Sequence, residues 1–466
     1  MSPAETIASD SRAGSPWSLP WSLDEYAITS DGFLPEELPL RKLPNPYYGP
    51  WEALVESLPA ALASRTLRDQ VHRLPVLSTE HLSTEPEWRR ACVILGFLAH
   101  AYIWGGATAA EVLPPQLAVP FLAATAHFGL PPVATFASLN LWNFEVASPG
   151  RDGDGDGDGP DLTDLDALRA QHTFTGTEDE SWFYVISVAM EAEGARLIPV
   201  LLRALHALSA APSPDTALTT STTTSTTPTA AAAAAVASQA LRETAACVER
   251  LGRLLERMDE RCRPDLRGGS NGQSSLVQFL DLALGVDHVP MGDSNSNSGS
   301  GSGSSRGKPA VGFHEEVRGY MPEPHRRFLE DVAARHPGGL KKGVERLLAT
   351  GGKGEGAADP LLAEVREAFR AATRALAEFR NKHLQMVTRY IIIPSRQPNN
   401  KRQEVNLATA SSKLRSSSSS SSSRKTRDTT PAGGGGELTG TGGTALIPFL
   451  KQTRDETVKA GQLECQ

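Results

Sequence analysis

The sequence predicts a mostly α-helical fold. Between residues 362 and 394, apolar side chains recur in steps of three and four, the spacing that places them on one face of a helix. The longest apolar run, residues 91–104, is shorter than the roughly 20 residues needed to span a bilayer and therefore predicts a buried helix. No stretch shows the sustained alternation of apolar and polar residues that is typical of strands.

Length and composition limit the possible classes of protein. A chain of 466 residues is long enough for two domains and a sizeable core. The net charge of -8 argues against a nucleic-acid-binding surface, which needs a basic patch. The four cysteines, Cys92, Cys247, Cys262 and Cys465, form no paired metal-binding motif and favour a reduced, cytoplasmic location. Residues 1–10 lack the basic start and apolar run of a signal peptide.

Changes in composition along the chain predict its domain boundaries. Residues 1–20 are small and polar and are expected to be disordered. A small helical domain is expected over residues 21–150, an acidic Gly/Asp linker over residues 151–165, and a large domain over residues 166–466. The linker resembles a calcium loop only superficially, because Thr163 or Leu165 stands where the bidentate glutamate would be needed.

Three low-complexity segments interrupt the large domain, at residues 213–235, 290–308 and 400–437. The first is a Thr/Ser tract running into alanines, the second is rich in Ser, Gly and Asn, and the third contains a pure serine run flanked by basic residues. Such segments carry too little apolar surface to form a core, so we expect surface insertions. The basic flanks leave an import signal or a phosphorylation site open, although a solvated linker fits them better.

One histidine interrupts the apolar helix face. The face comprises Leu362, Val365, Phe369, Ala372, Leu376, Phe379, His383, Met386 and Tyr390. His383 should therefore point inward, where a neutral imidazole can bind a metal ion or haem iron. The alternative is a core histidine that is hydrogen-bonded to a carbonyl group, and periodicity alone does not separate the two.

Four stretches resemble motifs of one known family. The run FRNKHLQMVTRYIIIP at residues 379–394 resembles the proximal-haem helix of the indoleamine 2,3-dioxygenase family. LPPVATFASL at residues 130–139 and WFYVIS at residues 182–187 resemble its distal-pocket helices, and GGSNGQSS at residues 268–275 resembles the loop over its haem edge. The motifs occur in family order, the likeness covers residues 43–459, and the fungal branch is the most similar.

The resemblance implies a two-domain, all-helical haem dioxygenase fold, with a small N-terminal domain capping a large helical haem domain. It implies haem b as the cofactor, and L-tryptophan or a related indoleamine and O₂ as substrates. The expected reaction inserts O₂ into the indole C2–C3 bond and gives N-formylkynurenine, the first step of the kynurenine pathway and of NAD biosynthesis from tryptophan. A cytoplasmic monomer without nucleic-acid or membrane partners is expected.

The resemblance also assigns residues to the proximal side of the haem. His383 is the expected ligand of the haem iron, and Arg380, Asp281 and Ser270 are expected to contact the cofactor. An Arg380–Asp281 pair or a contact with a haem propionate would fix the haem to its helix. For Asp281 in particular, an ordinary ion pair that does not contact the haem is an equally good interpretation.

On the distal side the family pattern falls on Phe136, Leu139, Phe183 and Ser187. They should form an aromatic, nearly dry pocket for an indole, with Phe136, Phe183 and Ser187 closest to the chemistry. Without the resemblance, Phe136 and Phe183 would be read as core aromatics. At the haem edge Gly269, Ser270 and Asn271 should line the amino-acid end of the substrate, and Thr441 belongs to a glycine-threonine loop that resembles a mobile cover.

The chain departs from the family pattern between residues 258 and 268. In relatives a further helix at this point carries a phenylalanine and an Arg-Pro pair, and that arginine binds the substrate carboxylate. Neither Arg263 nor Arg267 matches the motif. A missed exon is the favoured explanation, because loss of a buried helix would leave a large unfilled volume. If the deletion is real, the alternative is a haem protein that binds or senses oxygen without dioxygenase activity.

Overall fold

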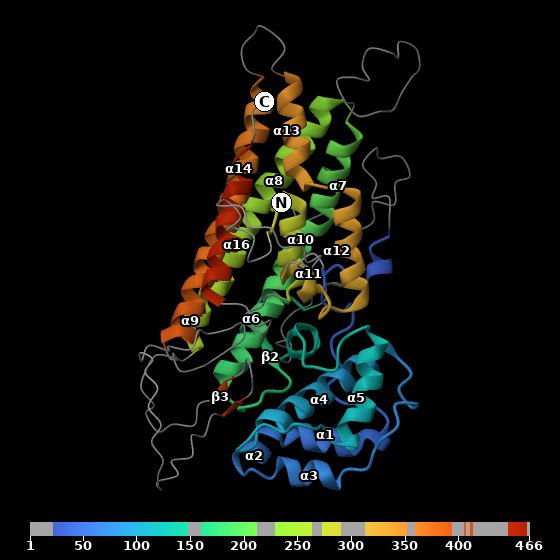
Figure 1. Ribbon diagram of the computed structural model, residues 1–466. Helices are drawn as coiled ribbons and strands as arrows, with labels where there is room; N and C mark the ends of the chain where they lie inside the picture. The colour runs from blue at the N-terminus through green and yellow to red at the C-terminus, as the bar shows by residue number, and fades with distance from the viewer. Residues whose placement is uncertain are drawn as a thin grey trace, which may run out of the picture.

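The computed structural model describes residues 22–147, 160–211, 229–262, 273–289, 313–351, 359–393, 405–406, 411–412 and 446–463. These residues are mostly helical, which confirms the predicted fold class. Figure 1 shows the N-terminal helices gathered at one end of the molecule and the later, longer helices extending away from them. None of the described helices is long and apolar enough to cross a membrane.

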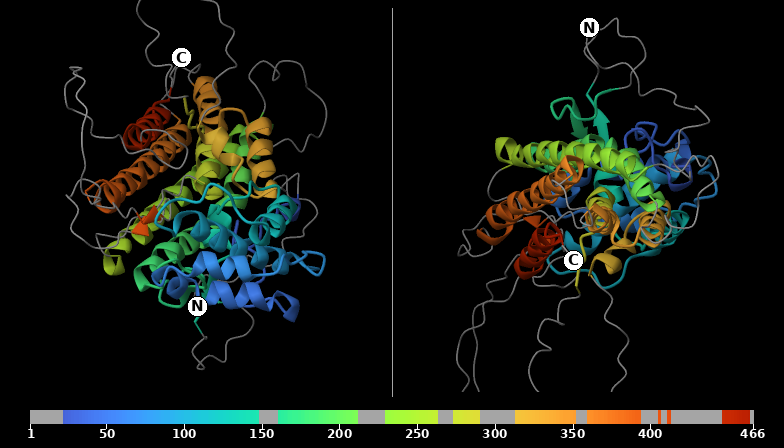
Figure 2. Two further views of the ribbon diagram at one scale, coloured as in Figure 1. Left: turned by 60° about the horizontal axis from the view of Figure 1, so that its bottom comes forward. Right: turned by 90° about the horizontal axis from the view of Figure 1, so that it is seen from above.

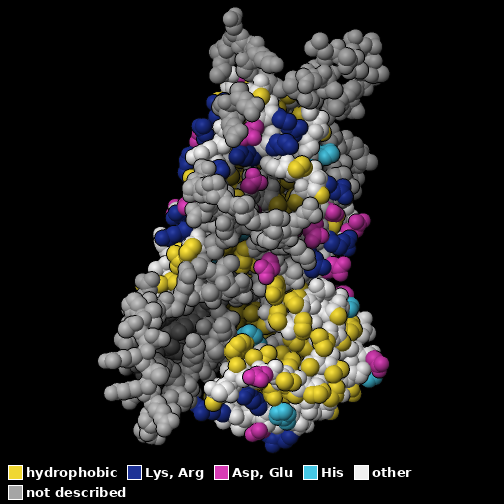
Figure 3. Space-filling view, in the orientation of Figure 1, with side chains coloured by type: hydrophobic (Ala, Val, Ile, Leu, Met, Phe, Trp, Pro, Cys, Tyr) yellow, Lys and Arg dark blue, Asp and Glu magenta, His cyan; other side chains and the backbone are white. Residues whose placement is uncertain are grey.

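The N-terminal part consists of short helices followed by a small hairpin. The elements are η1 (Asp24–Tyr26), η2 (Pro46–Tyr48), α1 (Gly49–Glu56), α2 (Leu58–Ala63), α3 (Leu67–Arg73), α4 (Glu85–Trp104), α5 (Pro115–His127), the π-helical turn η3 (Ala137–Leu141), and the antiparallel strands β1 (Phe144–Val146) and β2 (Leu168–Ala170). In Figure 3 hydrophobic side chains gather on the surface of this end.

The start of α4 is fixed by a capping box. The Thr84 side chain accepts the N–H of Glu87 at 3.4 Å, and the Glu87 carboxylate accepts the N–H of Thr84 at 3.0 Å. These bonds satisfy amide groups that have no partner inside the helix. The apolar run at residues 91–104 forms most of α4, and residues 91–99 are buried throughout, as the sequence predicts.

The larger part is built from long helices. The elements are α6 (Glu178–Ala195), α7 (Leu197–Ala210), α8 (Ala230–Glu256), α9 (Met258–Arg261), α10 (Ser275–Leu284), α11 (Phe313–Arg318), α12 (Glu323–Arg335), α13 (Gly339–Gly351), α14 (Pro360–Val387), the π-helical turn η5 (Thr388–Ile392), the strands β3 (Val405–Asn406) and β4 (Ser411–Ser412), and α16 (Leu446–Ala460). Helix α14 packs along α8 and against α16, and Figure 2 shows α14 and α16 side by side.

The alanine run corrects one prediction. The segment 213–235 was expected to stay outside the core, but residues 230–235 form the first turns of α8, where Ala233 and Ala234 are buried. Thr229 caps this end by accepting the N–H of Ala232 at 3.2 Å. Alanine has the highest helix propensity, and its small side chain allows α8 to approach its neighbours closely. The prediction was therefore wrong for the alanine end of the segment.

Several other predicted segments lie wholly or mostly outside the described residues. They are residues 1–20, residues 213–228, the insertion 290–308, most of the linker 151–165 and most of the insertion 400–437. Within the last of these, Val405 pairs with Ser412 in a short antiparallel bridge between β3 and β4. The domain boundaries stay predictions.

Helix α14 follows the predicted apolar face closely. Val365, Phe369, Ala372, Leu376, Phe379, Met386 and Tyr390 are all buried. Leu362 and His383, on the same face, are partly buried. At Thr388 the helix continues as the π-helical turn η5. Such turns are rare in proteins overall, but many of them occur at functional sites.

A buried ion pair joins α1 to α4. The guanidinium of Arg90 contacts the carboxylate of Glu52 through Nε at 3.1 Å and through a terminal nitrogen at 2.5 Å. Both side chains are buried, and Gln171 accepts a further bond from Arg90 at 2.6 Å. Such a pair is costly to break because removal of one partner leaves an uncompensated buried charge.

We expect Glu52→Ala to lower the free energy of unfolding by about 3–5 kcal/mol, because Arg90 would lose its counter-charge. Chemical denaturation monitored by circular dichroism measures this. The matched control is Glu145→Ala, which breaks the exposed Arg41–Glu145 pair of 3.2 Å and should cost less than about 1 kcal/mol. Equal effects of the two substitutions would contradict the prediction.

Candidate functional site

His383 lies near the C-terminal end of α14. Its imidazole is partly buried and has no hydrogen-bond partner among the described residues, so the core-histidine alternative with a carbonyl partner is not seen there. Desolvation by the surrounding protein, together with the nearby guanidinium of Arg380, lowers the pKa of His383 to about 4. The ring is therefore neutral at neutral pH and has a nitrogen available for a metal or haem iron.

One turn earlier, Arg380 forms a buried ion pair with Asp281 of α10. One terminal guanidinium nitrogen lies 2.6 Å from Asp281 Oδ1 and 2.7 Å from Oδ2. Burial alone would raise the pKa of Asp281, but Arg380 and His288 hold it well below its usual range. The carboxylate is thus ionised, and Arg380 and Asp281 form the ion pair that the sequence analysis considered, while their contact with a haem stays a prediction.

The same guanidinium connects α14 to α16. Arg380 donates to the hydroxyl of Thr457 and lies 3.5 Å from the carbonyl oxygen of Thr453. A single side chain therefore ties α14, α10 and α16 together immediately before His383. Because the arginine is buried, its contacts fix the rotation of α14 about its axis and hence the direction of the histidine.

The predicted distal residues come from two elements that pack on each other. Phe136 immediately precedes η3 and Leu139 lies within it, while Phe183 and Ser187 belong to α6. Phe136 and Ser187 are buried, and Leu139 and Phe183 are partly buried against the core. The structure thus brings the two predicted distal stretches together.

The described end of the glycine-serine loop reaches both distal elements. The side-chain oxygen of Gln273 accepts the N–H of Phe136 at 2.8 Å. Ser274 caps α10 and donates its hydroxyl to Glu191 of α6 at 2.7 Å. The loop is therefore anchored to the distal side. The predicted residues Gly269, Ser270, Asn271 and Thr441 lie outside the described part of the chain.

Glu191 is a buried acid that the sequence reasoning missed. It lies one helical turn after Ser187 on α6, and its second carboxylate oxygen has no partner within the described residues. Burial raises the pKa of Glu191 to about 7, and the bond from Ser274 opposes that shift only in part. The one available signal was its position four residues after Ser187, on the same face of α6.

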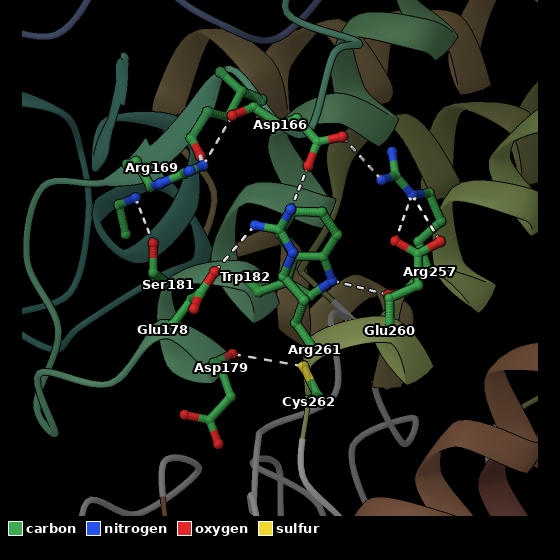
Figure 4. Close-up of polar contacts among 12 residues, drawn as sticks. Asp166, Arg169, Glu178, Asp179, Ser181, Trp182, Arg257, Glu260, Arg261 and Cys262 are labelled. Atoms are coloured by element: carbon green, nitrogen blue, oxygen red, sulfur yellow. Dashed lines mark hydrogen bonds and ion pairs between the residues drawn. The ribbon is translucent and has the colours of Figure 1, made fainter.

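Trp182 anchors the other side of α6 to α9. Its indole N–H donates to the carbonyl oxygen of Arg257 at 2.8 Å, and the guanidinium of Arg261 lies 4.1 Å from the ring centroid. Figure 4 shows Arg257 and Arg261 converging on Asp166 above this ring. Trp182 therefore belongs to a structural cluster that joins α6 to α9.

The same cluster fixes the start of the segment between Cys262 and Gln273. Because this segment lacks the helix expected from relatives, we call it the shortened joint. The Cys262 thiol lies 3.5 Å from the carbonyl oxygen of Asp179 in α6 (Figure 4). From the proximal side, the Tyr390 hydroxyl donates to Asp259 at 2.7 Å and lies 3.4 Å from the carbonyl oxygen of Cys262. Cys262 is therefore held by both α6 and η5, whereas Gln273 at the far end of the joint is held by Phe136.

One large groove lies apart from these residues. It has a volume of about 2120 Å³ and is lined by residues of the N-terminal segment, α7 and α8, among them Phe33, Arg203 and Arg250. None of the residues predicted for the haem or the indole pocket lines it. The site is therefore defined by side-chain chemistry rather than by this groove.

Comparison with known proteins decides the family. The family model described as indoleamine 2,3-dioxygenase matches residues 22–266 and 265–460 of this chain. The chain belongs to the indoleamine 2,3-dioxygenase family. The two matched stretches meet inside the shortened joint between Cys262 and Gln273.

Fungal members of the indoleamine 2,3-dioxygenase family are similar to this chain over nearly its whole length. The chain is 32% identical to an indoleamine 2,3-dioxygenase of Penicillium citrinum, over 94% of this chain and 88% of the relative. It is also 32% identical to the indoleamine 2,3-dioxygenase of Saccharomyces cerevisiae, over 95% and 94% respectively. A 6-hydroxytryptophan 2,3-dioxygenase of Fusarium equiseti is 32% identical over 95% and 98%. The protein is thus an oxidoreductase of the dioxygenase class.

Glu191 gives a prediction on the pH dependence of stability. A carboxyl group whose pKa rises from 4.5 to about 7 on folding stabilises the fold fully below pH 4.5, and this contribution is lost as the pH rises through about 7. Glu191→Gln should therefore be more stable than the parent chain above pH 7, by roughly 3 kcal/mol if the shift is fully expressed. Below pH 4.5 the two should be equally stable.

Urea denaturation of both proteins at several pH values measures this difference. The control is Glu193→Gln on the same helix, whose carboxylate pairs with Arg250 at 2.6 Å and with Arg196 at 2.9 Å. That substitution should destabilise at neutral pH. A constant difference between Glu191→Gln and the parent across the pH range would show that Glu191 does not titrate with folding.

Proposed function

We propose that this chain is a haem-dependent dioxygenase that inserts O₂ into the indole C2–C3 bond of L-tryptophan and gives N-formylkynurenine. The proposal rests on His383, a neutral imidazole without a described partner, one turn after the buried Arg380–Asp281 pair in a member of this family. The activities printed in the names of its fungal relatives agree with this reaction class.

The residues around His383 fit haem b. The low pKa of His383 keeps its ring unprotonated, as an axial ligand must be. The described segments near α14 carry no cysteine-based attachment motif, which favours a non-covalently held haem. When bound, the haem would supply the iron chemistry that activates dioxygen. Arg380 would keep α14 in position and add positive charge near the haem propionates.

The distal residues would orient and enclose the indole. Phe136, Leu139 and Phe183 offer apolar surface, which excludes water and aligns the ring by packing. Ser187 places one buried hydroxyl on that side. No protein base is needed, because the electron-rich C2–C3 bond of the indole is itself the nucleophilic partner of activated oxygen. Glu191 is uncharged below its pKa of about 7, so it adds no fixed negative charge behind Ser187 at mildly acidic pH.

The proposed site lacks the arginine that binds the substrate carboxylate in relatives. Residues 263–272 are all that separate Cys262 from Gln273, and both ends are fixed by α6, η5 and Phe136. The arginine-bearing helix expected from relatives has no counterpart in this joint. This observation favours a second candidate function, a haem protein that binds oxygen but turns over tryptophan weakly or not at all.

The substrate could carry an unsubstituted indole ring, as in L-tryptophan, or a hydroxylated one, as in 6-hydroxytryptophan. One relative of equal identity is named a 6-hydroxytryptophan 2,3-dioxygenase. We propose L-tryptophan as the substrate because, among the described residues assigned to the distal pocket, Phe136, Leu139 and Phe183 are apolar and Ser187 is the one polar side chain. Assay of L-tryptophan beside 6-hydroxytryptophan distinguishes the two.

Loss of the proposed iron ligand gives the direct test of haem binding. His383→Ala should abolish the Soret band of the purified protein, because no second protein ligand is proposed. The control is His206→Ala on α7, also a partly buried helical histidine, which should keep the parent spectrum. An unchanged spectrum with stoichiometric haem in His383→Ala would refute the assignment.

Restoring the missing helix tests the carboxylate clamp. A charged amino acid bound without its arginine forfeits a charge-assisted pair worth about 2–5 kcal/mol when desolvated. The chain as it stands should therefore show little formation of N-formylkynurenine, and insertion of the relatives' helix between Cys262 and Gln273 should raise it. Absorbance of the product measures both.

A glycine-serine insert of the same length is the matched control, since it lengthens the joint without adding an arginine. Rescue by that control would show that length rather than charge is limiting. Full activity of the unmodified chain would show that another residue binds the carboxylate. A chain that binds haem but stays inactive even with the restored helix would favour the oxygen-binding alternative.

A further inference from the structure

A second cluster of metal-binding side chains lies on the far side of Arg380. Asp281 of α10, His288 just beyond α10 and His314 of α11 each place one ligand atom within 4.8 Å of the others. All three, together with Glu456 of α16, line a cavity of about 360 Å³. His383 is not among its lining residues, so the cluster is separate from the proposed haem ligand.

The spacing between Asp281 and His288 is that of two ligands of one metal ion. His288 Nε2 is buried and lies 3.1 Å from Asp281 Oδ2. In a tetrahedral zinc site with bonds of about 2.0–2.2 Å, neighbouring ligand atoms lie roughly 3.3 Å apart. The separation of 3.1 Å is therefore compatible with two ligands of one metal ion.

His314 supplies a third ligand. Its Nε2 is buried and has no hydrogen-bond partner among the described residues. Its ring lies against that of His288, with centroids 3.8 Å apart and planes inclined by 18°. His314 stands in the first turn of α11, and its ligand atom lies within 4.8 Å of those of Asp281 and His288.

Two of the three proposed ligands, His288 and Asp281, are held in place by neighbouring charged side chains. His288 Nδ1 lies 2.6 Å from a carboxylate oxygen of Glu456, a contact that fixes the direction of the ring. Burial opposes the charged ring, but Asp281 and Glu456 raise the pKa of His288, so an incoming metal ion would displace a proton from Nε2. Glu456 is itself held by the N–H of Val289 at 3.0 Å and by Gln452 at 2.8 Å. On the other side Arg380 holds Asp281. The two carboxylates, Asp281 and Glu456, offset part of the positive charge of Arg380 and of an added divalent ion.

We propose that Asp281, His288 and His314 bind a divalent transition metal, with Zn²⁺ the best match, and that the cavity provides its fourth, open coordination position. Two imidazoles and one carboxylate suit zinc rather than magnesium or calcium, which prefer all-oxygen sites. The ion would join α10 to α11 and, through Glu456, to α16. The site shares Asp281 with the pair that holds Arg380, but the proposed haem ligand His383 is not one of its ligands.

Zinc binding by the haem-loaded, full-length protein tests the proposal. After treatment with a chelator, the protein is titrated with ZnCl₂ against a chromophoric competitor, and bound zinc is measured by elemental analysis. The parent chain should hold about one zinc per chain, and Mg²⁺ should not compete. His314→Leu should lose this zinc, and Glu456→Gln should weaken its affinity by about 10–100-fold, as for other groups that orient a metal ligand.

The matched control is His336→Leu, which removes a histidine at the end of α12 that contacts Ser209 instead of the cluster. It should bind zinc as the parent does. The Soret band and circular dichroism of each variant show whether the fold is intact, and Glu456→Gln serves if His314→Leu does not fold. Equal zinc binding by the parent, His314→Leu and Glu456→Gln would overturn the proposal. Absence of zinc binding in the parent would also overturn it, and would leave a protonated His288 bridging Asp281 and Glu456.

Discussion

The buried pair between Arg380 and Asp281 is the interaction on which the rest of the site depends. It joins α14 to α10, and the same guanidinium reaches Thr457 of α16. Because both charges are buried, neither can move toward solvent without leaving the other uncompensated. His383 follows one turn later on a helix whose axial rotation is thus fixed, while the opposite face of Asp281 meets His288. One carboxylate therefore stands between the proposed haem side and the proposed zinc cluster.

The sequence predicts the parts of this arrangement that depend on local periodicity. The apolar face of α14 and the buried helix at residues 91–104 follow from spacing alone, since a helix face is a property of consecutive residues. The pairing of Arg380 with Asp281 came from resemblance to the family. The contacts of Arg380 with Thr457 and of Asp281 with His288 could not be predicted, because they join elements whose packing no local pattern encodes.

Glu191 and the alanine run show two different reasons for failure. In a sequence a glutamate on a helix normally indicates a solvent-facing position, and only the three-dimensional setting of α6 reveals that Glu191 is buried. The alanines at residues 230–235 look like low complexity because they follow a Thr/Ser tract, yet small size is what close helix packing needs. Composition describes a segment on its own, whereas burial depends on what lies against it.

Both proposed faces of the haem pocket adjoin a π-helical turn, η3 after Phe136 and η5 at the end of α14. In η3 the N–H of Trp142 bonds the carbonyl oxygen of Ala137 at 2.9 Å, five residues back rather than four. Such a turn accommodates one residue more than an α-helical turn does. Deletion of a single residue there would remove the wide turn and change which side chains of that short segment face the proposed pocket, since successive residues of a helix are rotated by about 100°. These two short segments should therefore tolerate substitutions far better than changes in length. When a related sequence is compared with this chain, a one-residue gap in either segment would indicate a loss of function more clearly than several substitutions would.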